Sequence, residues 1–104
     1  MNETFKQQVF EIIKMIPIGR VTTYGAIAKA VGFPNYSRHV GNALRNYDED
    51  FPAHRVCSAC GIISAESCIP KFTEKLAKEG VTVKGNKIQN FKQVFWNPLE
   101  EINL

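Results

Sequence analysis

The segment TTYGAIAKAVGFPNYSRHVGNALR, residues 22–45, decides the fold of this chain. Its first half places apolar residues at helical spacing, and Gly32 stands where a helix commonly ends in a left-handed residue. A turn is expected at residues 33–35, and a further helix from about residue 36 to 46. Two short helices joined by a tight turn predict a helix-turn-helix.

A supporting helix is predicted before this segment. Apolar residues recur at helical spacing over residues 5–16, and Thr4 is the expected N-cap of that helix. Either Thr22 or Thr23 is expected to cap the helix that follows. The first helix is therefore expected to serve as scaffold for the helix-turn-helix.

The second half of the chain is expected to complete a fold that is mainly α with a small β-element. Pro70 suits the first position of a fourth helix, which Gly80 is expected to end. Residues 81–89 are expected to form a hairpin, and the aromatic residues within 91–96 to pack the tail onto the core. The sequence therefore predicts a single helix-turn-helix domain, winged-helix-like, over residues 1–104.

Composition limits the class of protein. A chain of 104 residues with 44% hydrophobic residues supports one modest globular core. No apolar run reaches membrane-spanning length, the first residues lack the features of a signal peptide, and three cysteines are an odd number for a disulfide framework. We expect a cytoplasmic monomer without membrane contact.

The charge distribution is more informative than the net charge of +3. No acidic residue occurs over residues 12–47, an interval that holds five lysines and arginines. Within it, Arg38, Asn42 and Arg45 share the outward face of the predicted third helix. Such a face suits contact with a phosphate backbone, although charge alone fits a solvated basic surface equally well.

Four motifs, in order, resemble those of the O6-alkylguanine-DNA alkyltransferases. IPIGRVTTYGAIA, residues 16–28, is similar to the family segment Ile-Pro-x-Gly-x-Val-x-Thr-Tyr-Gly-x-Ile-Ala. RHVGNAL, residues 38–44, resembles the recognition helix Arg-x-Val-Gly-x-Ala. FPAHRV, residues 51–56, resembles the active-site loop Pro-Cys-His-Arg-Val, and Glu79-Gly80-Val81 follows further on.

The sequence differs from that family at the position of the reactive cysteine. Members transfer an alkyl group from guanine to the loop cysteine, and this chain has Ala53 at the cysteine position. A methyl group cannot act as a nucleophile. Trp or Ala at this position is typical of the alkyltransferase-like proteins, so the resemblance implies a non-catalytic protein that needs no cofactor.

The resemblance also implies roles for individual residues. Arg38 matches the residue that fills the stack after a nucleotide is flipped, and Tyr24 matches the tyrosine that presses on the adjacent phosphate. With Asn42 and Arg45, these residues form the expected DNA-binding set.

The lesion pocket is expected to be lined by Tyr24, Ala53, His54 and Glu79, and Arg55 is expected to brace the loop. His54 and Glu79 match the pair that activates the cysteine in transferases, and here a His–carboxylate contact is expected to support the loop. The implied function is binding of O6-alkylguanine in double-stranded DNA by nucleotide flipping. Shielding of the lesion from alkyltransferases and transfer to nucleotide excision repair proteins follow from the same resemblance.

Two other interpretations compete with this one. Cys57 and Cys60 have the spacing of a zinc knuckle, which Cys68 and His54 would complete, but a second compact ligand pair is missing. We therefore predict no bound metal. A plain helix-turn-helix regulator would explain residues 20–46 and leave the loop motif unexplained.

Overall fold

A computed structural model of the chain describes residues 3–45, 51–64 and 66–101. The acidic cluster at residues 48–50, for which a solvated loop is expected, and Asn46 lie outside the described residues. The α-helices are α1 (Glu3–Met15), α2 (Tyr24–Ala30), α3 (Ser37–Arg45), α4 (Ile69–Lys78), α5 (Phe91–Val94) and α6 (Pro98–Glu101). The short strands are β1 (Thr22–Thr23), β2 (Val56–Cys57), β3 (Val83–Lys84) and β4 (Lys87–Ile88). Single 3-10 turns are η1 (Ala53–Arg55), η2 (Ala59–Gly61) and η3 (Glu66–Cys68).

The helix-turn-helix is present where the sequence predicts it. Thr23 caps α2, because its hydroxyl oxygen accepts a hydrogen bond of 3.0 Å from the amide of Ala26. Gly32 follows the helix with a φ of +91°, the left-handed conformation expected there. The cap predicted for the first helix is wrong: Thr4 lies within α1, which begins at Glu3.

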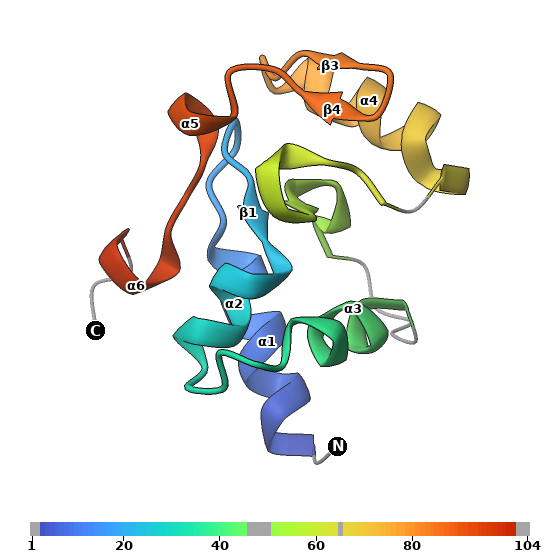
Figure 1. The fold of residues 1–104 in the computed structure, drawn as a ribbon. Coiled ribbons are helices and arrows are strands. Elements are labelled where there is room, and N and C mark those ends of the chain that lie inside the picture. The colour runs from blue at the N-terminus through green and yellow to red at the C-terminus, as the bar shows by residue number, and fades with distance from the viewer. Residues whose placement is uncertain (1–2, 46–50, 65, 102–104) are drawn as a thin grey trace.

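Helices α1, α2 and α3 gather at one end of the molecule, and α4 with the β3–β4 hairpin lies at the other (Figure 1). The tail between them carries α5 and α6. Among the described residues, no helix is long and apolar enough to cross a membrane.

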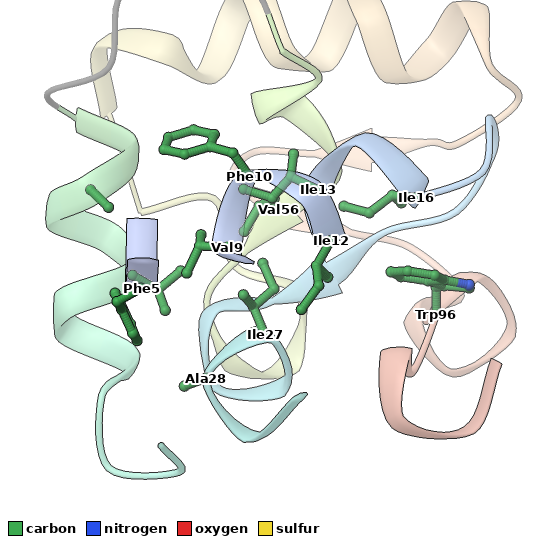
Figure 2. Close-up of a cluster of buried hydrophobic side chains, with 12 residues drawn as sticks. Phe5, Val9, Phe10, Ile12, Ile13, Ile16, Ile27, Ala28, Val56 and Trp96 are labelled. Carbon is green, nitrogen blue, oxygen red and sulfur yellow. The ribbon is translucent and has the colours of Figure 1, made fainter. Parts of the chain in front are cut away.

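The core is divided between these two ends. One cluster joins the buried side chains of α1 with Ile27, Val40, Val56 and Trp96 (Figure 2). The predicted packing of the tail is confirmed, since Trp96 is only 4% exposed and belongs to this cluster. A second cluster around Leu76 and Ile88 supports α4 and the hairpin.

A parallel strand pair connects the two clusters and was not predicted from the sequence. Thr22 is in register with Val56, and Thr23 with Cys57. The tail joins the same region, because Val21 exchanges backbone hydrogen bonds with Val94 and Trp96. The pairing fixes the loop that holds Ala53 directly beside the start of α2. The predicted hairpin is confirmed, with Val83 opposite Ile88 and Lys84 opposite Lys87.

Candidate nucleic-acid interface and base pocket

Helix α3 has an apolar face and a polar face. Val40 and Ala43 are buried against the core, whereas Arg38, Asn42 and Arg45 are exposed. The polar side chains share one side because residues three and four apart are neighbours on a helix. The structure thus gives α3 the outward face that the sequence predicts.

A cavity of about 570 Å³ opens between α3, the start of α2 and the loop at Ala53. Five of the predicted site residues line it: Tyr24, Arg38, Asn42, Arg45 and Ala53. Its volume lies within the range of about 300–1,000 Å³ that is common for ligand pockets. Elements far apart in sequence therefore form one hollow that joins the predicted DNA-binding face to the predicted loop.

Ser64, Cys68 and Phe72 also line this cavity, and none of them was predicted as a pocket residue. They come from the segment before α4 and from α4 itself. Residues 64–68 match the family pattern poorly, so no motif pointed to them. Only the tertiary contact of α4 with the loop brings them to the site.

His54 and Glu79 are not among the residues that line this cavity, and their place in the lesion pocket stays a prediction. They border a separate hollow of about 460 Å³ together with Phe51, Pro52 and two lysines of α4. The reason is the position of the Glu79 carboxylate, which bonds the loop and the chain before β1. His54 Nε2 lies 2.7 Å from Glu79 Oε2, and the amide of Gly19 donates to Oε1 at 3.2 Å.

Arg55, for which the role of loop brace is predicted, makes three hydrogen bonds to other parts of the chain. Arg55 donates to both carboxylate oxygens of Glu79, from Nε at 3.0 Å and from Nη2 at 2.8 Å. A third bond runs from Arg55 Nη1 to the carbonyl oxygen of Ile16 at 3.1 Å. The side chains of His54, Arg55 and Glu79 are only 10–14% exposed. One carboxylate therefore ties the end of α4 to the loop and to the segment between α1 and β1.

The charge state of Glu79 reflects these contacts. Burial by itself would raise the pKa of the carboxyl group, but the hydrogen bonds from Arg55, His54 and the Gly19 amide outweigh burial and lower the pKa to about 2. Glu79 is consequently a carboxylate at neutral pH. Its negative charge keeps the Arg55 guanidinium paired in a partly buried place.

The cysteines are placed differently from one another. Cys57 is buried in β2, where its thiol donates to the carbonyl oxygen of Thr22 at 3.3 Å, and burial raises its pKa to about 12. Cys60 is exposed, and Cys68 lines the cavity. Within the described ranges, no group of three or more His, Cys, Asp or Glu side chains is arranged to hold a metal ion.

Comparison with known proteins identifies the family. A sequence model of the 6-O-methylguanine DNA methyltransferase DNA-binding domain matches residues 4–81. The chain belongs to this family. The resemblance to alkyltransferase-like proteins is also confirmed, as is the helix-turn-helix fold class predicted for an alkyltransferase DNA-binding domain.

Similar proteins match over most of this alkyltransferase-type domain. A DNA base-flipping protein of Vibrio parahaemolyticus is 38% identical over 99 residues, covering 92% of this chain and 99% of the relative. Alkyltransferase-like protein 1 of Schizosaccharomyces pombe is 31% identical and covers 92% of this chain and 97% of that protein.

Solved structures agree with these relatives. S. pombe Atl1, crystallised with damaged DNA containing O6-carboxymethylguanine, superposes with a TM-score of 0.81 at 29% identity, over 94% of this chain and 99% of that one. The O6-methylguanine methyltransferase of Mycobacterium tuberculosis has a TM-score of 0.66 at 30% identity, over 76% of this chain and 50% of that one. The chain thus corresponds in extent to Atl1 and to about half of the transferase.

Proposed function

We propose that this protein recognises O6-alkylguanine in duplex DNA by flipping the nucleotide out of the stack, and that it leaves the alkyl group on the DNA. The single observation that carries the proposal is the position of Ala53. It lines the cavity beside the polar face of α3, at the place where the transferase motif has its cysteine. The cavity offers room for a base and no nucleophile at that position.

The placement of Cys57, the cysteine next along the chain, supports a non-catalytic function. Cys57 lies four residues after Ala53, but its sulfur is buried against Thr22 and its raised pKa keeps it protonated at neutral pH. Alkyl transfer requires a thiolate close to the alkyl carbon. Binding requires only shape, stacking and phosphate contacts, all of which are independent of a thiol.

The roles proposed for the cavity residues follow from their places around it. Arg38 projects from the first turn of α3, where it is proposed to fill the gap that the flipped guanine leaves. Tyr24 begins α2 and borders the same cavity, where it is proposed to press on the adjacent phosphate. Asn42 and Arg45, further along α3, are proposed to contact the DNA backbone. Arg55 and Glu79 are proposed to hold the loop rather than to touch the base.

The biological consequence proposed here is persistence of the complex. Because no covalent step ends the encounter, the bound protein would shield the lesion from alkyltransferases and direct it to nucleotide excision repair. We further propose that residues 1–104 act as a single monomeric domain without a cofactor, in the cytoplasm and on the nucleoid when bound to DNA.

The test uses a duplex with a radiolabelled methyl group on O6 of one guanine. After incubation and denaturation, all label is expected on the DNA, while a native gel shows a complex that resists undamaged competitor. Label on the protein would overturn the non-catalytic proposal. Equal affinity for damaged and undamaged duplex would overturn lesion recognition and favour a general DNA-binding regulator.

Ala53→Cys supplies a matched positive control. It places a thiol at the cavity, one residue before His54, whose Nε2 contacts the Glu79 carboxylate. We propose that the other ring nitrogen of His54 is aligned with position 53 and acts as the base for the new thiol. We expect slow appearance of label on this variant and none on the wild type, measured by denaturing electrophoresis. No transfer by the variant would contradict the proposed alignment of His54 with position 53.

A further inference from the structure

Three aromatic rings form an exposed stack at the turn between α2 and α3. The rings of Phe33 and Tyr36 lie 5.0 Å apart with an interplanar angle of 27°. The rings of Tyr36 and His39 lie 4.4 Å apart at 23°. Phe5 of α1 supports the stack from the core, with centroids 5.8 Å from Phe33 and 5.7 Å from Tyr36. We call Phe33, Tyr36 and His39 the aromatic shelf.

The shelf is exposed although its rings are apolar. Phe33 is 44% and Tyr36 38% exposed, and His39 is also an exposed residue. Rigid aromatic rings that remain on the surface offer a large contact area at little entropic cost, since their positions are already fixed by stacking. The shelf is therefore a rigid, exposed apolar surface that a binding partner can contact at little entropic cost.

The position of the shelf indicates which partner it fits. Tyr36 immediately precedes α3, and His39 follows Arg38 within it. Successive helix residues point about 100° apart, so Arg38 is directed to the cavity while His39 lies on the flank of the same helix. If α3 faces a groove of the duplex, the flank of its first turn meets the strand that borders that groove.

Charge favours the same partner. The shelf lies in the interval 12–47, which contains no acidic residue and five basic ones. The tyrosine hydroxyl and an imidazole N–H are hydrogen-bond donors suited to phosphate oxygens, and the ring faces suit packing on a deoxyribose. A basic or strongly apolar protein partner has no comparable support from the surroundings.

We propose that the aromatic shelf packs against the sugar–phosphate backbone of the strand beside the groove that α3 enters, with Tyr36 and His39 donating to phosphates. This inference rests on the proposed placement of α3 on DNA. It follows that the aromatic shelf and the cavity contribute differently to DNA binding. The shelf contributes affinity for any duplex, whereas the cavity and Arg38 contribute the preference for the lesion.

The test measures fluorescence anisotropy with two duplexes that differ only in guanine or O6-methylguanine at one position. Tyr36→Phe removes the hydroxyl and keeps the ring stack, and His39→Ala removes the outer ring from an exposed helix position. Each is expected to weaken binding to both duplexes by the same factor, about two- to tenfold, with an unchanged ratio between them.

Ile18→Ala is the matched control. Ile18 is 74% exposed, and the loop between α1 and β1 that carries it lies toward the opposite end of the molecule from the α2–α3 turn (Figure 1). This variant is expected to bind both duplexes like the wild type. Thermal melting verifies that each variant is folded.

The outcomes separate the two proposals. Wild-type affinity in the Tyr36→Phe, His39→Ala double variant, or a loss confined to the damaged duplex, would overturn the aromatic shelf. A wild type that does not prefer the damaged duplex would instead overturn lesion recognition, while equal weakening by the shelf variants would still support the shelf as a DNA contact.

Discussion

Replacing Glu79 with glutamine tests whether one carboxylate holds the loop that carries Ala53. Glu79 accepts two hydrogen bonds from Arg55 and one from the Gly19 amide, and it pairs with His54 at 2.7 Å. Glutamine retains one acceptor oxygen and places an NH₂ donor against groups that are themselves donors. The Arg55 guanidinium, 14% exposed as a side chain, loses its counter-charge.

Removing one partner of a buried ion pair typically costs about 3–5 kcal/mol, because the remaining charge is left uncompensated. The side chains concerned keep some contact with water, so we expect about 3 kcal/mol, at the lower end. For a domain of this size, 1 kcal/mol corresponds to roughly 4–8 °C in Tm, which gives a decrease of roughly 12–24 °C. Urea denaturation followed by circular dichroism measures the free energy of unfolding directly.

The control is Glu74→Gln on α4, the helix that ends directly before Glu79. Glu74 pairs with Lys78 at 3.5 Å, but both side chains are more than 70% exposed. An exposed pair of this kind contributes about 0.3–0.5 kcal/mol. If Glu79→Gln costs no more than Glu74→Gln, the network does not hold the loop and the reasoning is refuted.

The same network predicts the direction of a pH effect. The pKa of Glu79 is lowered from 4.5 to about 2 in the folded protein, so the folded state favours the carboxylate. Its stabilising contribution is complete above pH 4.5 and is lost as the pH falls toward 2. Glu79→Gln should therefore show a shallower loss of stability across this window than the wild type.

Three further predictions concern the cavity and the cysteines. Arg38→Ala should weaken binding to O6-methylguanine duplex by about 1–3 kcal/mol, measured by titration; affinity equal to that of the wild type would contradict its proposed role in the stack. Protein purified without added zinc should contain no stoichiometric metal by elemental analysis, and a chelator should leave its melting curve unchanged. Unfolding on chelation would show a structural metal site. Iodoacetamide at pH 8 should label Cys60 and Cys68 but not Cys57 in the native protein, since burial raises the pKa of Cys57 to about 12. Peptide mass spectrometry locates the labelled cysteines. Rapid labelling of Cys57 would contradict its buried position.

The sequence by itself determined the features that depend on near neighbours. Helix periodicity located α1 and the helix-turn-helix, and Gly32 was identified as the residue after α2 because few other residues adopt a positive φ. The order of the motifs is the basis for the proposal that Ala53 stands where a transferase has its cysteine. One local detail was wrong: Thr4 is an acceptable cap by residue type, but α1 already includes Glu3, so Thr4 lies inside the helix.

The tertiary structure alone decided how distant segments meet. The pairing of Thr22 with Val56 depends on backbone hydrogen bonds between segments too short to show strand periodicity. That pairing directs Cys57 into the interior. It also places Ala53 opposite α3, so that Phe72, from a segment without a recognisable motif, completes the cavity.

Glu79 illustrates the physical reason most clearly. Its motif position predicted a place in the lesion pocket, but the sequence did not show which donors its carboxylate would bind. Those donors come from Gly19 and Arg55, residues 60 and 24 positions away in the chain. Short-range patterns fix which helices form, whereas the partners of a buried charge are fixed only when packing brings remote donors within hydrogen-bonding distance.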